Sequence, residues 1–198
     1  NGAVDNASAC ATLLAIAEAV VRRPARRSQM FLFTFGEEQG LIGAKAYVQR
    51  PLWPLERTVA ALNLESLNWV GPSRDIELLG GERSDLGELG ARVAAALGMA
   101  LRPAEPDSAG LYFRSDHFPF AAAGVPALSP GFSLLGQRDY LGDGERLRAQ
   151  ARGFRERYHQ PSDDYDASWD LRGMVQQGQF ILELGLLIAD APGRPRWR

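Results

Sequence analysis

The feature that most constrains the fold is a short apolar run that stops at a glycine and is followed by two carboxylates. Residues 30–35 are apolar except for Thr34 and rich in aromatic side chains, which is typical of a strand buried on both faces of a mainly parallel sheet. Glu37 and Glu38 then lie at the carboxyl end of this strand, the edge of open α/β sheets where ligands bind. Because neighbouring residues at a strand exit point in different directions, one carboxylate can bind a cation while the other faces a substrate. A solvated acidic turn is the alternative interpretation of such a pair.

Strands and helices alternate along the rest of the chain. Apolar periodicity, caps and breakers predict helices over residues 6–22, 42–50, 86–97, 116–123 and 168–191, and strands over residues 29–35, 58–64, 75–79 and 126–129, with a further short strand and a loop within 99–115. The strand over 58–64 also ends on an acid, Glu65, at the same sheet edge. Residues 131–160 are polar without a sustained period, which predicts a long functional loop that brings His159 to the site.

This alternation predicts the fold class. We expect an α/β protein, a three-layer α/β/α sandwich with a mixed, mostly parallel sheet, formed by residues 1–198 as a single domain. The chain has 22 basic and 24 acidic residues and a net charge of −2, so charge does not favour binding to nucleic acid or to an anionic membrane. Glu183 and Asp190 interrupt the apolar segment nearest the C-terminus, so we expect no membrane span. The single Cys10 cannot form an internal disulfide.

A second acidic segment, Gly2-Ala-Val-Asp-Asn-Ala-Ser8, precedes the helix of small residues. Together with the Gly36-Glu37-Glu38 strand exit, it resembles the zinc aminopeptidases of peptidase family M28. The resemblance extends over nearly the whole chain, in the family's order, through Asn63-Leu-Glu65, Arg114-Ser-Asp-His-Phe-Pro-Phe120, Gly124-Val-Pro126 and Tyr158-His-Gln-Pro-Ser-Asp163.

The resemblance implies a zinc site with two ions when intact. Asp5 would bridge the ions, Glu38 and His159 would complete one of them, and Glu65 would bind the other. Carboxylate oxygen and imidazole nitrogen are ligands that zinc accepts, and a shared carboxylate offsets the repulsion between two cations.

The resemblance also implies the catalytic residues. Glu37 would be the general base, taking a proton from the metal-bound water and returning it to the leaving amine. Tyr158 would stabilise the oxyanion with its phenol, although an ordinary half-buried aromatic residue is an equally good interpretation. His159 lies in a turn that core packing would not require, which favours a ligand.

Two features depart from the family pattern. The family takes a further ligand histidine from a His-x-Asp segment upstream of the Asp5 loop, so we expect more chain before Asn1, and this fragment would hold one zinc firmly and a second weakly. His117 does not match that histidine, and its expected role is structural, fixing the loop of the specificity wall. Glu65 stands where many members have aspartate, which changes the reach of the carboxylate.

The remaining candidates have secondary roles. Arg114 could bind a substrate carboxylate, or a carboxylate that supports the metal site, with its planar guanidinium. Asp163 or Asp164 could orient the free ring nitrogen of His159, or both could belong to a solvated turn.

By resemblance, the function is hydrolysis of the peptide bond next to a free N-terminus, by a protein that is secreted or periplasmic. The first alternative is a glutaminyl-cyclase-like aminoacyltransferase, which resembles the same fold with one zinc. The second is a non-catalytic, peptidase-like binding domain, against which the retained Glu37 argues, because a cluster of carboxylates is costly without a use. The sequence does not predict the preferred side chain of the substrate or the oligomeric state.

Overall fold

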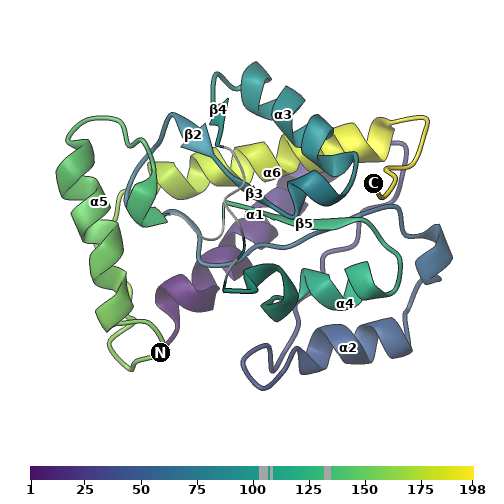
Figure 1. Ribbon diagram of the computed structural model, residues 1–198, viewed down its shortest axis with the longest axis horizontal. Coiled ribbons are helices and arrows are strands. Elements are labelled where there is room, and N and C mark those ends of the chain that lie inside the picture. Colours follow the sequence, from purple (N-terminus) through teal and green to yellow (C-terminus); the bar gives the residue numbers. More distant parts are fainter. Residues whose placement is uncertain (103–106, 108, 132–134) are drawn as a thin grey trace.

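The computed structural model describes residues 1–102, 107, 109–131 and 135–198. Within these residues the helices are α1 (Ser8–Arg22), α2 (Ile42–Gln49), α3 (Leu86–Ala96), α4 (His117–Ala122), α5 (Gly144–Gly153) and α6 (Arg172–Asp190). The strands are β1 (Ala61–Leu62), β2 (Asp75–Ile76), β3 (Leu78–Leu79), β4 (Ala100–Leu101) and β5 (Ala127–Pro130). Helices and strands are interspersed along the chain and in space (Figure 1). The loops predicted after residue 101 and after residue 131 lie partly outside the described residues.

The sheet is mixed, as predicted. β5 lies between β1 and β3, pairing parallel with β1 and antiparallel with β3. β2 and β4 form a separate parallel pair. β1 and β5 are parallel neighbours, so their carboxyl ends open toward the same edge, and Glu65 follows β1 there.

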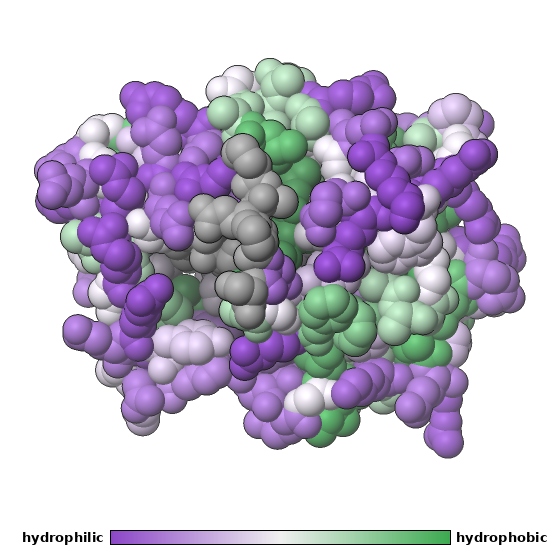
Figure 2. Space-filling model, in the orientation of Figure 1, coloured by the Kyte–Doolittle hydropathy of each residue, from purple (hydrophilic) through white to green (hydrophobic). Residues whose placement is uncertain are grey.

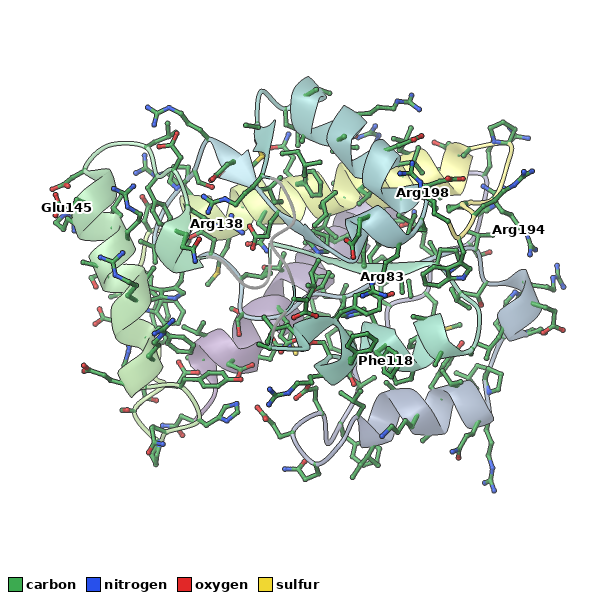
Figure 3. The ribbon with its side chains drawn as sticks, in the orientation of Figure 1. Arg83, Phe118, Arg138, Glu145, Arg194 and Arg198 are labelled. Atoms are coloured by element: carbon green, nitrogen blue, oxygen red, sulfur yellow. The ribbon has the colours of Figure 1, made fainter. Side chains whose placement is uncertain are left out.

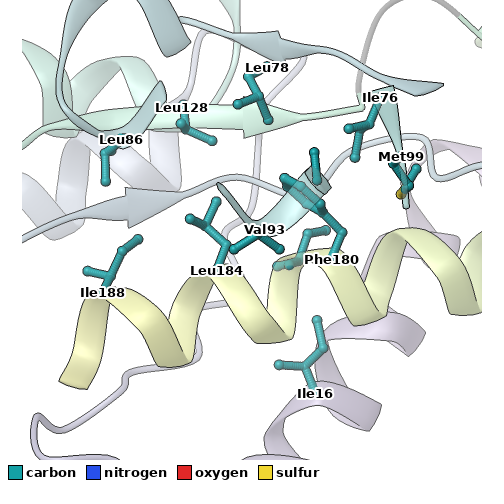
Figure 4. Close-up of a cluster of buried hydrophobic side chains, with 12 residues drawn as sticks. Ile16, Ile76, Leu78, Leu86, Val93, Met99, Leu128, Phe180, Leu184 and Ile188 are labelled. Carbon is teal, nitrogen blue, oxygen red and sulfur yellow. The ribbon is translucent and has the colours of Figure 1, made fainter. Parts of the chain in front are cut away.

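Helices cover both sides of these strands. On one side, Ile16 of α1, Val93 of α3, and Phe180 and Leu184 of α6 form a buried cluster with Leu128 of β5 (Figure 4). On the other side α4 contacts β1 and β5, and α2 packs on α4. The predicted three-layer α/β/α arrangement is therefore confirmed, with the apolar core between the strands and α1, α3 and α6.

The predicted strand over residues 29–35 was wrong. Residues 29–34 make no backbone hydrogen bond within the described part of the chain, and the Phe35 carbonyl accepts only from Gly43 at the start of α2. The segment is also not buried on both faces, since Met30, Phe33 and Phe35 are 52%, 49% and 68% exposed. An apolar run favours a strand only where a neighbouring strand supplies hydrogen bonds, and no strand of the described residues pairs with this segment.

Three other expectations needed correction. The strand over residues 58–64 is reduced to the two residues of β1, because only Ala61 and Leu62 pair with β5. The polar stretch after residue 131 contains α5, whose N-terminus is capped by the Asp143 carboxylate accepting from the Arg146 N–H (3.1 Å). α5 has a hydrophilic surface (Figure 2) and buries only Leu147 and Ala151, so its low apolar content concealed the helix. The last helix begins at Arg172 rather than near Ser168.

One helical stretch of the described residues, Ala3–Arg22, is long and apolar enough to cross a membrane by length and composition alone. Core helices and signal sequences meet the same criteria, so the stretch is weak evidence for a span. The expectation that no segment spans a membrane is therefore not confirmed.

Candidate metal centre

Three side chains from distant parts of the chain converge at the carboxyl edge of the strands. Asp5, Glu38 and His159 each offer one ligand atom, and these atoms all lie within 4.8 Å of one another. His159 Nε2 lies 2.5 Å from Glu38 Oε1 and 3.3 Å from Asp5 Oδ2. Two carboxylates and an imidazole at this spacing form the kind of donor set that binds zinc.

The Asp5 loop is held by the side chains that flank it. Asp5 and Asn6 have non-helical backbone angles within the turn Ala3–Ala7, and the peptide between them is cis. The Asn6 amide donates to the Leu64 carbonyl (3.3 Å) and accepts from the Ser66 N–H (3.1 Å). Asp5 is thereby tied to the segment around Glu65.

The hydroxyl of Ser8 makes a second link between the same two segments. Ser8 Oγ donates to the Val4 carbonyl (2.6 Å) and accepts from the Leu67 N–H (3.1 Å). Neither Asn6 nor Ser8 was among the predicted site residues. The signal that could have found them is their place in the Gly2–Ser8 motif, where side chains able to bond to backbone sit beside the acid.

A glycine turn places Glu37 and Glu38. Gly36 has φ +65°, a conformation that favours glycine, and a Cβ there would lie 3.2 Å from the Ile42 Cβ. The Gly36 carbonyl accepts from the Ile42 N–H (3.0 Å), so the start of α2 fixes the turn. Glu38 joins the cluster, whereas Glu37 is outside the group of three.

Glu37 lies in a negative and partly buried environment. Burial, then the charges of Glu38, Asp116 and Asp5, raise the pKa of Glu37 to about 7. Asp116 is held at this place by the Thr34 hydroxyl, which donates to its carboxylate. A carboxyl whose pKa is near neutral can accept and return a proton in neutral solution.

Glu65 is more deeply buried and stands apart from the group of three. It is 8% exposed, and Asn63 Nδ2 donates to its Oε2 (3.2 Å). Burial raises the pKa of Glu65 to about 8, against hydrogen bonds from Ser115 and Asn63 that lower it. The charges of Glu37 and Asp5 act on Glu65, which places the carboxyl next to the cluster.

His159 lines the site, and its neighbour Tyr158 packs against it. His159 has φ +59°, an uncommon conformation for a residue other than glycine, of the kind that concentrates at functional sites. The Tyr158 ring stacks on the imidazole, with ring centroids 3.7 Å apart. Burial, followed by the charges of Asp5 and the nearby glutamates, raises the pKa of Tyr158 to about 12, so its phenol stays protonated.

Two predicted residues lie away from the three-residue cluster. Arg114 is exposed, and no hydrogen bond or ion pair joins it to the cluster in the described part of the chain. His117 is 2% exposed and packs edge-on against Tyr112, with ring centroids 4.7 Å apart. Burial lowers the pKa of His117 to about 4, so the imidazole is neutral in a packed setting, in keeping with its expected structural role.

The structure gives Asp163 a different contact from the predicted one. Its carboxylate faces the Asp5 loop, where it accepts from the Val4 and Asp5 N–H groups, rather than the ring of His159. The exposed Asp164 accepts from the Asn1 side-chain amide (2.7 Å). The predicted orienting contact between either aspartate and His159 is therefore not made.

The cluster borders an open depression of about 500 Å³ lined by Asn1, Asp5, Glu38, His159, Gln160 and Pro161. A second hollow, of about 430 Å³, lies by the amino ends of β1 and β5 and the C-terminal residues 194–197. Arg194 marks it in Figure 3, at the opposite end of the molecule from Glu145 on α5. Of these two hollows, the first adjoins Asp5, Glu38 and His159.

An α/β fold that gathers two carboxylates and an imidazole at the carboxyl edge of its strands defines a protein with a candidate metal centre. The chain belongs to peptidase family M28, since the family model, described as Peptidase family M28, matches residues 1–184. No curated protein sequence gives a significant match.

Solved structures share the fold. An aminopeptidase from Aneurinibacillus sp. strain AM-1 is 23% identical with a TM-score of 0.68, over 98% of this chain and 41% of that one. BSAP, a zinc aminopeptidase from Bacillus subtilis, is 20% identical with a TM-score of 0.71, and the match covers 98% of this chain and 44% of BSAP. The LapA aminopeptidase of Legionella pneumophila is 16% identical with a TM-score of 0.68, and the match covers 97% of this chain and 48% of LapA. The chain thus spans less than half the length of these relatives.

Proposed function

We propose that the protein is a zinc-dependent aminopeptidase that hydrolyses the peptide bond next to a free N-terminus. The observation that carries the proposal is the convergence of Asp5, Glu38 and His159 beside Glu37, a carboxyl outside that group. Membership of a peptidase family supports hydrolysis of a peptide bond. The solved relatives with this fold are named as aminopeptidases, one of them as a zinc enzyme, which supports the finer assignment.

The donor atoms of the cluster fit a divalent cation. His159 Nε2 lies 2.5 Å from an oxygen of Glu38 and 3.3 Å from one of Asp5, so one nitrogen and two oxygen donors occupy one small volume. Burial and the charge of Glu38 raise the pKa of Asp5, which shows that the metal-free arrangement disfavours the ionised carboxylate. A cation at the centre would remove this repulsion, and zinc accepts these donors.

The chain's own residues would move the protons. A zinc ion bound by Asp5, Glu38 and His159 would lower the pKa of an attacking water and polarise the scissile carbonyl. Glu37, whose pKa is about 7, would take a proton from the attacking water and give it to the leaving amine. The Tyr158 phenol, still protonated at neutral pH, would donate a hydrogen bond to the developing oxyanion.

The proposal includes a stoichiometry. One zinc would bind firmly at the group of three, and a second would bind weakly between Asp5 and Glu65, because the second site would draw on two carboxylates without an imidazole. Metal analysis of the purified protein at increasing zinc should therefore give one tight equivalent before any further binding.

The test combines metal binding with hydrolysis of aminoacyl anilides. The protein should bind zinc and release the anilide product, lose activity with a chelator and recover it when zinc is returned. His159→Ala should lose the tight zinc, whereas Glu145→Gln, a change on the hydrophilic α5, should retain it. A folded protein that binds no zinc, or that turns over glutaminyl peptides by cyclisation in place of anilides, would contradict the proposal.

A further inference from the structure

We infer that Asp163 is a positioning residue for the metal centre, holding the Asp5 loop against the loop of His159. The inference rests on the proposed zinc function and adds a residue to it. In this inference the buried Asp163 carboxylate holds the two ligand-bearing loops in place and adds a negative charge beside Asp5.

The Asp163 carboxylate is bonded to the backbone that carries Asp5. It is 1% exposed, and its Oδ1 accepts from the Val4 N–H at 3.0 Å. Its Oδ2 accepts from the Asp5 N–H at 3.0 Å and lies 3.2 Å from the Val4 nitrogen. The Asp163 carbonyl also accepts from the Ala3 N–H (2.9 Å), so three successive N–H groups of the loop bond to one residue.

The same residue closes the turn that carries His159. The Asp163 N–H donates to the Gln160 carbonyl (3.0 Å), in the turn that follows His159 and its left-handed backbone. Its side chain thus fixes one proposed ligand, and its backbone fixes another, although Asp5 and Asp163 are 158 residues apart in sequence. Asn6 and Ser8 tie the Asp5 loop to the segment around Glu65. Asp163 supplies the buried link toward His159, beside the exposed bonds of the Asn1 amide to Pro161 and Asp164.

The charge of Asp163 supports a role toward a cation. A buried carboxylate is costly unless hydrogen bonds or an opposite charge compensate it, and the donors found here are neutral backbone N–H groups. Within the described residues no ion pair involves Asp163. Its negative charge acts on the adjacent Asp5 and would be offset by a bound cation.

The test is zinc affinity, measured on folded protein by competition with a chromophoric chelator. Asp163→Asn keeps the shape but leaves one acceptor oxygen for two N–H groups and removes the charge, so zinc should bind about 10- to 100-fold more weakly. The visible spectrum of the cobalt-substituted protein should also change, because the ligand geometry changes. Asp164→Asn, at the exposed neighbour, is the matched control and should stay within about twofold of the original affinity.

The outcomes separate the two proposals. Zinc binding by the original protein, with equal affinity and an equal cobalt spectrum for Asp163→Asn, would overturn the positioning role and leave the proposed function standing. Absence of zinc binding by the original protein would overturn both. If Asp163→Asn fails to fold, Asp163→Glu keeps both acceptor oxygens on a longer arm, and it should fold but bind zinc more weakly. Unchanged affinity in Asp163→Glu would overturn the inference.

Discussion

Glu37 and Glu38 are adjacent in the chain, yet the fold gives their carboxylates different neighbours. Glu38 contacts the imidazole of His159 at 2.5 Å, within the proposed ligand group. Glu37 is surrounded by carboxylates and partly buried, which raises its pKa to about 7. The same residue type can therefore serve as ligand at one position and as proton carrier at the next, because environment sets the pKa.

This difference predicts the behaviour of Glu37→Gln. The substitution keeps the volume and removes the proton acceptor, so the protein should retain its zinc while kcat falls about 10²- to 10⁴-fold. Metal analysis beside anilide hydrolysis measures both properties. Glu56→Gln, which changes an exposed carboxylate next to the second hollow, should leave kcat unchanged. Substantial remaining turnover in Glu37→Gln would remove Glu37 from the role of base.

At the scale of single residues, the sequence predicted which side chains meet but not where each one points. The resemblance to family M28 predicted that Asp5, Glu38 and His159 belong together, and the structure places their ligand atoms within 4.8 Å of one another. Their roles stay predictions until metal is measured. The spacing of Asp163 from His159 predicted proximity, but only the path of the turn decides that its carboxylate bonds to backbone at Asp5.

For helices and strands, backbone hydrogen-bonding partners determined the secondary structure where composition predicted it wrongly. Residues 29–35 have the composition of a buried strand and α5 has that of a loop, and both predictions were wrong. The first segment lacks a paired neighbour among the described residues, so an extended chain does not become a strand. α5 buries only Leu147 and Ala151, and its other residues are so polar that the stretch was interpreted as a loop.

α6 shows an element whose polar residues support the site. Gln177 is 1% exposed, and its Oε1 accepts from the Asn68 N–H (3.0 Å) while its Nε2 donates to the Pro130 carbonyl (2.9 Å). Asn68 lies in the segment that follows Glu65, and Pro130 ends β5. A buried glutamine on this helix thus joins two segments at the carboxyl edge of the strands.

Gln177→Met should therefore destabilise the protein without changing the helix. Methionine has similar length, but it leaves the Asn68 N–H and the Pro130 carbonyl without these partners, which typically costs about 1–3 kcal/mol for a buried group. Urea unfolding at fixed zinc measures the loss. Val175→Ala, at a 68% exposed position of α6, is the control and should change the free energy of unfolding by less than about 0.5 kcal/mol. Equal stabilities of the two variants would show that the Gln177 bonds contribute little.

Across the molecule, the fold concentrates negative charge at one place, which the small net charge does not reveal. The net charge is only −2, yet Asp5, Glu37, Glu38, Glu65 and Asp116 meet at one edge of the sheet. The sequence could predict the layers and this edge, because apolar segments recur along the chain and acids follow two of them, although the first segment, residues 29–35, is not a strand. The sequence could not predict how far the pKa values of Glu37 and Glu65 are raised, because that depends on burial and on distances between segments far apart in the chain.

This concentration of carboxyls predicts how the stability of the metal-free protein depends on pH. The pKa of Glu65 is raised from 4.5 to about 8, and that of Glu37 to about 7, so the folded state holds these protons more tightly than the unfolded state does. The stability that they contribute is fully present below about pH 4.5 and is lost as the pH rises through 7 to 8. Bound zinc should remove this loss, since a cation favours the ionised carboxylates.

Glu65→Gln isolates this effect from the other titrating groups of the chain. Its uncharged amide has no proton to lose, so the variant lacks this pH-dependent loss of stability. Without metal, the Tm difference (variant minus original protein) should therefore increase steadily between about pH 5 and pH 8.5. Thermal unfolding in the presence of a chelator measures this difference, and saturating zinc is the control. With zinc the difference should shrink or change sign, because the original carboxylate then has a cation to bind. A difference that stays constant with pH in the metal-free protein would show that burial does not hold Glu65 protonated.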